Sequence, residues 1–436
     1  MREDGVVIGS VLLGAAALLA VHFLLLHSYW DYSEGVYALT AHQMLHGGDL
    51  YGRIVGAQPP GVFLAGMALL AIHSSVEWLR FGVACLQLGA GLIAARIVYR
   101  VSGNRIATAV TPAAMLLTPW AVHEHGALTP EMVALPVMLG AALLSADARR
   151  SAVAGGLCGL LVLIKLPLAI PAVVLVVMSA EVRSAATAAA ATLAAGLAVT
   201  WLAGGAGFWR DVVVAQLHSG SRSLSELAGF WAQAGWNVLG LLVAAAAAIW
   251  LRGQTRDRRL LNVAIALAVA NLVTFLSNFK LGTGLNITVP VEASLVPLAA
   301  IGTAFAFRAA AARRHPRARW AAWACALGVV FTLAQSISLI ASPSNPIPFL
   351  RAFSAPAWEI TLTADQFDQA VRNARACPAG VAYGGPPLIA LAAGRLLPAG
   401  QPDEFLPGHS STLAAVNAQI TAVRNVCPES LAPGTS

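Results

Sequence analysis

Long apolar stretches recur along most of the chain, with short polar segments between them. Eleven stretches approach the roughly 20 residues that a helix needs to cross a bilayer. They are 6–26, 80–98, 107–122, 131–146, 153–164, 166–180, 185–204, 236–251, 260–278, 287–307 and 320–341. The pattern predicts an all-α polytopic membrane protein with about eleven transmembrane helices. The first stretch is too long for the core of a signal peptide and no small-residue cleavage site follows it, so we expect an uncleaved first span.

The composition and charge agree with a membrane protein. The chain is 58% hydrophobic and 11% charged, whereas soluble domains are about 25% charged. A single soluble domain and a disordered chain are therefore excluded. The net charge of +7 comes from 25 Arg and 2 Lys against 20 acidic residues. Most Arg lie in short loops between apolar stretches, which is typical of a topology signal and not of a nucleic-acid surface.

Three basic clusters set the predicted orientation. They lie at 149–150, 252–259 and 308–319, and the positive-inside rule places them in the cytoplasm. The N-terminus is then cytoplasmic and the C-terminus extracytoplasmic, in the plasma (inner) membrane. The apolar piece 61–72 is too short to span, so we expect an interfacial or re-entrant helix in a first outer loop at 27–79. The short pair 153–164 and 166–180 is expected to form a hairpin, because one tilted helix there would invert everything that follows.

The chain after the last apolar stretch differs in composition. Residues 342–436 are richer in Pro, Gly, Asp and Asn. We expect a transmembrane module at 1–341 and a small extracytoplasmic α/β region at 342–436. Within it the pattern predicts a helix over 363–375, a strand over 380–383 and a helix over 388–393. Cys377 and Cys427 would pair if this region is outside the cytoplasm.

The first outer loop holds two carboxylates next to the membrane surface. Asp31 and Glu34 precede or begin a helix expected over 34–46. Either carboxylate suits a general base that takes a proton from an acceptor hydroxyl. The alternative is an interfacial loop whose acids cap a helix and face water.

The same loop offers possible metal ligands. His42 and His46 have the i, i+4 spacing that can bind a divalent metal, although histidines on an interfacial helix have the same spacing. Asp49 together with Asp31 or Glu34 could instead hold Mg²⁺ or Mn²⁺ through oxygen ligands. The metal therefore stays unknown.

The second outer loop packs four titratable groups into nine residues, His123, Glu124, His125 and Glu131. We expect Thr129 to cap the next helix and Pro130 to begin it. The helix dipole alone then explains why an acidic residue stands at position 131, in the first turn of that helix. It does not account for Glu124 between two histidines.

The two lysines both fall at the predicted outer side. Lys165 lies at the tip of the expected hairpin, and a lysine within membrane sequence is functional by default. Lys280 follows the span 260–278. Two ammonium groups could neutralise a phosphate or diphosphate, whereas snorkelling at a helix end would suit Lys280 better than Lys165. The polar loop at 208–222 could be a lid or an inert connector.

Several short motifs occur in the order found in one enzyme group. They are Gly35-Val36-Tyr37 after the acids, Gly47-Gly48-Asp49-Leu50-Tyr51, Pro59-Pro60-Gly61, Leu128-Thr129-Pro130-Glu131 and the hairpin segment 156–165. With the uncleaved first span, this layout resembles the GT-C glycosyltransferases over about residues 6–345, and most of all the aminoarabinose transferase and protein O-mannosyltransferase groups.

The resemblance implies a GT-C-like fold and an inverting transfer of a sugar from a polyprenyl-phosphate donor to a glycan, lipid or protein acceptor on the outer face. It implies a carboxylate base in the first outer loop, for which we take Glu34 first and Asp31 second. The family often has adjacent acids, but here Ser33 precedes Glu34. Many members also have Lys before Pro-Pro, but here it is Gln58. The phosphate contact would then pass to Lys165, Lys280 or Arg53.

The remaining polar residues of the outer loops would line the cavity: Asp49, His123, Glu124, His125 and Glu131. Two other functions stay open. A lipid-linked-sugar flippase or other transporter should carry charges within its spans, and here only Glu292 and Lys165 do. A membrane scaffold would have no use for the acid-rich first loop.

Overall fold

The computed structural model describes residues 3–25, 32–276, 279–280, 284–312, 316–341, 362 and 364–428. Within these ranges each of the eleven predicted apolar stretches is helical. The helices are α1 (Glu3–Leu25), α4 (Val76–Ser102), α5 (Arg105–Leu116), α6 (Pro119–His123), α7 (Pro130–Ser145), α8 (Ser151–Ile164), α9 (Ala169–Met178), α10 (Val182–Gly204), α13 (Leu224–Trp250), α14 (Arg258–Leu276), α15 (Thr288–Ala311) and α16 (Pro316–Ala341). The stretch 107–122 is divided between α5 and α6.

The described helices differ in whether they can cross a membrane alone. Six are long and apolar enough, namely α1, α4, α10, α14, α15 and α16, and α13 is a seventh if its two halves, bent by 43°, form one span. The others are shorter helices, and α5 and α7 contain an internal proline. The chain is thus a multi-pass membrane protein in which short helices pack beside the full spans.

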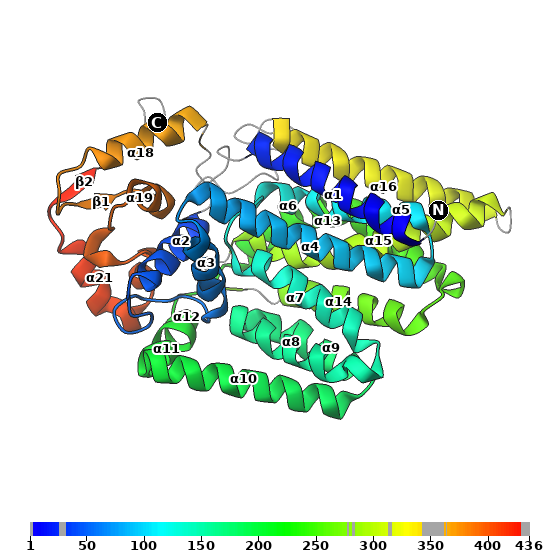
Figure 1. The fold of residues 1–436 in the computed structure, drawn as a ribbon, viewed down its shortest axis with the longest axis horizontal. Helices are drawn as coiled ribbons and strands as arrows, with labels where there is room; N and C mark the ends of the chain where they lie inside the picture. Colours follow the sequence, from blue (N-terminus) through cyan, green and yellow to red (C-terminus); the bar gives the residue numbers. More distant parts are fainter. Residues whose placement is uncertain are drawn as a thin grey trace.

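The arginine-bearing turns lie together at one end of the bundle, away from the C-terminal elements (Figure 1). The Arg256 amide donates to the Val101 carbonyl at 2.9 Å. The Arg308 guanidinium donates to the Ser102 carbonyl at 2.8 Å. The hairpin prediction is also confirmed, since the Glu181 amide after α9 returns to the Ser151 hydroxyl at 3.1 Å.

The opposite end of the bundle carries the first loop and the C-terminal elements. The loop forms α2 (Tyr32–Leu45) and α3 (Gly61–Ile72), and α3 has the two ends predicted for the interfacial piece. The C-terminal elements are α18 (Ala364–Arg375), β1 (Ala382–Gly384), α19 (Pro387–Ala393), α20 (Phe405–His409), α21 (Ala414–Thr421) and β2 (Val426–Pro428). The helix and strand predictions are confirmed to within a few residues. The division of the chain at residue 342 stays a prediction.

Two links hold the C-terminal elements together. β1 and β2 pair in parallel with Tyr383 opposite Cys427, and Cys377 and Cys427 form a disulfide. α19 packs directly on α2. A Cβ on Gly35 would come within 2.4 Å of the Leu388 amide nitrogen. Glycine at this position therefore allows the two backbones to touch.

The connection after α10 is shorter than predicted. The predicted stretches 185–204 and 236–251 leave residues 205–235 between them as an outer loop. Instead, α13 begins at Leu224 after a short run of helical turns, α11 (Ala206–Phe208), a π-helical segment (Trp209–Val214) and α12 (Ala215–Leu217). The cause is a capping box: the Ser223 hydroxyl accepts from the Glu226 amide and the Glu226 carboxylate accepts from the Ser223 amide. This Ser-x-x-Glu signature was present in the sequence.

Candidate functional site

Glu34 lies in a closed ion pair. It sits in the first turn of α2 with its side chain fully buried, and Arg80 of α4 donates to both carboxylate oxygens. The Nε–Oε1 distance is 2.9 Å and the Nη2–Oε2 distance is 2.7 Å. Burial raises the pKa of Glu34, whereas the Arg80 guanidinium and the Leu128 amide act in the opposite direction. Both oxygens are engaged, so the pair fixes α2 against α4 and the second loop.

The second outer loop is buried against the same pair. Gly126 has φ +71°, and a Cβ there would come within 2.7 Å of the Arg80 carbonyl. The Gly126 amide donates to Gln87 at 3.4 Å. At the other end of this loop, the carboxylate of Glu292 in α15 accepts from the Trp120 amide at 3.1 Å. These contacts hold the loop in one conformation.

The histidines of that loop lie inside the protein. Glu124 and His125 are buried, and His123 Nδ1 is 3.5 Å from the Glu124 carboxylate. The His125 ring centroid is 5.6 Å from that of His22 in α1. Burial and the positive neighbours His22 and Arg80 lower the pKa of His125 to about 3, so this imidazole is neutral.

Lys165 and Glu131 form a second buried ion pair. Thr129 caps α7 and Pro130 begins it, as predicted. However, the helix dipole is not the whole account of Glu131, because Lys165 Nζ at the end of α8 donates to its Oε1. Asn286 donates to Oε2 at 3.3 Å. The tip of the hairpin thereby places an ammonium group at the start of α7.

Lys280 belongs to the same charged group. Burial, and then the charges of Lys165 and Arg222, lower its pKa to about 8, while Asp403 acts in the opposite direction. Residue 280 forms an isolated antiparallel bridge with Ser221, and the Arg222 amide donates to the Phe279 carbonyl at 2.9 Å. The charge of Lys165 thus acts on Lys280, and both lysines lie at the same end of the bundle. We call Lys165, Glu131, Lys280, Arg222 and Asp403 the lysine group.

The C-terminal elements reach both the lysine group and the start of α2. Asp403 is buried, and its Oδ1 accepts from the Phe405 and Leu406 amides at 2.9 and 3.1 Å. The Glu404 amide donates to the Tyr32 hydroxyl at 3.0 Å. Asp31 precedes Tyr32 in the chain but lies outside the described residues. The contact at Tyr32 therefore places the start of α2 beside the segment that carries Asp403.

Arg53 and Asp49 lie in the loop before α3. Arg53 is exposed, and its backbone carbonyl, not its guanidinium, is bound by Gln401 at 2.7 Å. Asp49 lies over Gly52, where a Cβ would come within 1.8 Å of Oδ2. Both residues shape the loop before α3, and the Arg53 carbonyl anchors it to the C-terminal elements.

Among the described residues, His42 and His46 are neighbours on α2. His46 Nδ1 is 2.8 Å from the His42 carbonyl, and the two rings lie 4.3 Å apart. Within the part of the chain that the structure describes, no three His, Cys, Asp or Glu side chains are grouped as a metal site would require.

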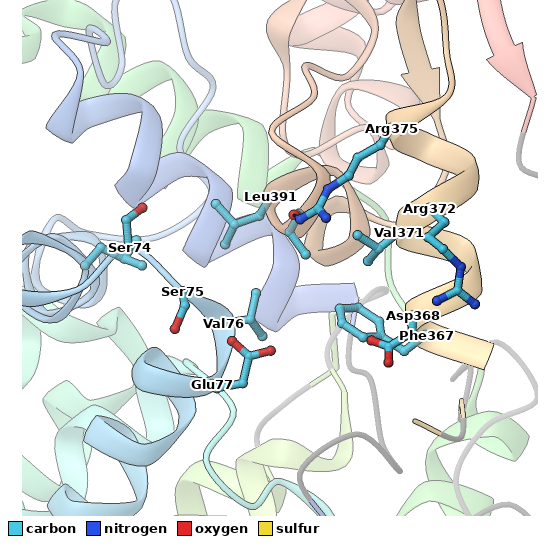
Figure 2. Close-up of a pocket in the computed structure, with 12 residues that line it drawn as sticks. Ser74, Ser75, Val76, Glu77, Phe367, Asp368, Val371, Arg372, Arg375 and Leu391 are labelled. Carbon is cyan, nitrogen blue, oxygen red and sulfur yellow. Dashed lines mark hydrogen bonds between the residues drawn. The ribbon is translucent and has the colours of Figure 1, made fainter. Parts of the chain in front are cut away.

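A polar groove lies beside this end of the bundle (Figure 2). It has a volume of about 520 Å³ and separates the α3–α4 turn from α18 and α19. Glu77 extends into it from one side and Arg375 from the other, with Asp368 and Arg372 further along α18. The Arg375 guanidinium also donates to the Ala392 carbonyl at 2.9 Å. The groove thus presents both signs of charge next to α19, which packs on α2.

The overall arrangement matches a solved membrane protein. Two crystal structures of ArnT from Cupriavidus metallidurans superpose on this chain with a TM-score of 0.60, one in the apo state and one bound to undecaprenyl phosphate. The sequences are 18% identical, and the match covers 96–97% of this chain and 89% of ArnT. The chain has the fold of ArnT. No protein-family model and no curated protein sequence matches the chain.

ArnT is a GT-C aminoarabinose transferase, so the predicted GT-C-like all-α membrane fold is confirmed. Three charged residues at this end of the bundle were not predicted from the sequence: Arg80, Arg222 and Asp403. Arg80 is the first residue of the apolar stretch 80–98, where an arginine in membrane sequence was a usable signal. Arg222 and Asp403 lay in polar segments, and only the fold brings them beside the lysines.

Proposed function

We propose that this chain is a membrane glycosyltransferase that transfers a sugar from a polyprenyl-phosphate donor to an acceptor at the outer face. The observation that carries the proposal is the lysine group, which combines two lysines and an arginine at the end of the bundle where the acid-bearing first loop lies. The ArnT structure with undecaprenyl phosphate supports a donor of this class.

The lysine group would bind the donor phosphate. In an inverting transfer the acceptor oxygen forms a bond to the anomeric carbon as the bond from that carbon to the phosphate oxygen breaks. The polyprenyl phosphate leaves with both bonding electrons. Lys165, Lys280 and Arg222 would stabilise the negative charge that develops on it. The ammonium of Lys280, with a pKa of about 8, is mainly protonated at neutral pH.

We assign the general base to Asp31 and a positioning role to Glu34, which reverses the order taken from the sequence. A base needs a free oxygen within hydrogen-bond reach of the acceptor hydroxyl. Arg80 engages both oxygens of Glu34, and breaking a buried pair is costly. Asp31 is the acid nearest to Glu34 in the sequence, three residues before it.

The orientation and the acceptor path follow from the charges. The arginine-bearing turns would face the cytoplasm. In that orientation the N-terminus would be on the cytoplasmic side of the inner membrane and the C-terminus on the extracytoplasmic side. The polar groove would receive the acceptor, since it opens beside α19 and offers Glu77, Arg372 and Arg375.

The test compares two carboxylate variants in one assay. Purified protein is incubated with a labelled polyprenyl-phosphate sugar and a membrane extract as the acceptor source. Asp31→Asn should lower the rate by about 10²–10⁴-fold with an unchanged unfolding temperature. Glu34→Gln should lower the unfolding temperature as well.

The outcomes separate the candidates. Full transfer by Asp31→Asn would exclude Asp31 as the base and return Glu34 to that role. Full transfer by both variants would exclude the mechanism. Movement of the labelled lipid across proteoliposomes without a new glycosidic bond would favour the flippase.

A further inference from the structure

An apolar groove runs along the membrane-facing side of the bundle, on α15 between α5 and α16. It has a volume of about 410 Å³. Alanines form much of its lining, among them Ala107, Ala114, Ala299 and Ala300. Its rim carries exposed Ile106, 77% accessible, and Phe307, 51% accessible. Because the groove lies within spanning helices and is almost wholly apolar, a hydrocarbon chain is the occupant that fits it.

The groove extends along α5 between Asn104 and Leu117, and Phe307 lies at its Asn104 end. Near Leu117 the Ser336 hydroxyl of α16 donates to the Leu117 carbonyl at 2.5 Å. The 13 residue steps from Asn104 to Leu117 correspond to about 20 Å of helix, which exceeds the roughly 15 Å of one leaflet's hydrocarbon. One acyl chain can therefore lie along it.

Arginines lie near the end of the groove at Asn104 and Phe307. α5 begins with Arg105, α15 carries Arg308 in its last turn, and α16 has Arg317 and Arg319 in its first. All four are exposed. The segments that form the groove contain no acidic residue: there is no Asp or Glu in 104–118, 236–254 or 293–341. A phosphate at this end would meet cations from three helices, because the acid of these helices, Glu292 of α15, binds the Trp120 amide near the other end.

We infer that this groove is a binding site for one anionic phospholipid, with its acyl chain between α5 and α16 and its phosphate at the arginines. Basic pockets between spanning helices bind anionic lipid headgroups in this way. The donor's chain is a poorer fit, since its phosphate is proposed to bind at the opposite end of the bundle. The inference does not depend on the proposed activity.

Native mass spectrometry of the full-length protein in detergent tests the inference. The probes are dioleoyl phosphatidylglycerol and dioleoyl phosphatidylcholine. We expect one retained phosphatidylglycerol per chain and no comparable retention of phosphatidylcholine. Arg105→Gln should weaken phosphatidylglycerol binding about fivefold, the worth of one basic residue near an anionic lipid. Ala114→Phe, at an exposed groove position, should abolish retention.

Two matched variants control for charge and bulk. Arg183→Gln removes an exposed arginine at the same end of the bundle, on α10, and Ala190→Phe adds a ring to an exposed alanine of that helix. Neither should change retention. Equal binding of both lipids, or equal losses in the controls, would overturn the inference and leave the arginines as topology signals. Displacement of phosphatidylglycerol by undecaprenyl phosphate, with a raised donor KM in Ala114→Phe, would assign the groove to the donor chain instead.

Discussion

The two buried ion pairs, at the end of the bundle that carries α2 and the C-terminal elements, differ in how many of their polar atoms find partners within the pair. Glu34 and Arg80 face each other through two hydrogen bonds, and their side chains are at most 1% exposed. Lys165 donates to Glu131, but Lys280, Arg222 and Asp403 share the same surroundings. An ammonium group has three donors. Within the described ranges, Lys280 Nζ makes no hydrogen bond to the protein. The Glu34–Arg80 pair therefore has a structural role. The Lys165–Glu131 pair belongs to a charged site that could also bind an anion.

The largest expected effect comes from opening the closed pair. Arg80→Met should lower the free energy of unfolding by about 3–5 kcal/mol, because it leaves the buried Glu34 charge without its partner. Thermal unfolding of the purified protein measures this loss.

The double variant Arg80→Met/Glu34→Met serves as the control. Replacing a buried pair by apolar side chains is often neutral, so much of the loss should be recovered. If the single variant were as stable as the unchanged protein, the pair would not be the architectural element described above.

Lys165→Met should weaken binding of undecaprenyl phosphate by about 10- to 100-fold, the scale of one charge-assisted contact. Isothermal calorimetry or a competition assay against the labelled donor measures the affinity. The variant also leaves Glu131 without its cation and should destabilise the protein.

The double variant Lys165→Met/Glu131→Gln separates stability from binding. It removes the unpaired carboxylate, so stability should return while the affinity stays low. Recovery of the affinity together with the stability would mean that Lys165 only holds the hairpin against α7.

The lysine group should also make binding depend on pH. The pKa of Lys280 is lowered to about 8, so its positive charge is present below pH 8 and is lost as the pH rises through that value. A bound phosphate favours the charged form. Affinity for undecaprenyl phosphate should therefore fall above pH 8, by up to about tenfold per pH unit.

Lys280→Gln is the comparison for that profile. Its affinity should be lower throughout and should lack the fall above pH 8. An unchanged profile in this variant would assign the titration to another group.

The same contrast explains which features the sequence could predict. The helix Gly61–Ile72 was predicted with both ends, because Pro60 precedes it and a polar turn follows. The partners of the two ion pairs were not predicted: Arg80 lies 46 positions from Glu34, and Lys165 lies 34 from Glu131. Which side chain faces which depends on helix packing, and periodicity does not encode it. The two lysines could be predicted because charged residues in apolar sequence are rare.

The smallest expected effect has the opposite sign and tests the open site most directly. Asp403 is the carboxylate from the C-terminal elements that favours the charged form of Lys280. A bound phosphate would have to compete with it. Asp403→Asn removes this competitor, while the amide oxygen can still accept from Phe405 and Leu406 and so keep the start of α20. Affinity for undecaprenyl phosphate should rise about two- to fivefold, within the range of one partly screened charge pair.

Glu404→Gln is the matched control, because the backbone amide of Glu404, not its carboxylate, binds Tyr32. A weaker affinity in Asp403→Asn would show that Asp403 holds Lys280 in place for the phosphate, and the lysine group would then need its carboxylates as much as its cations.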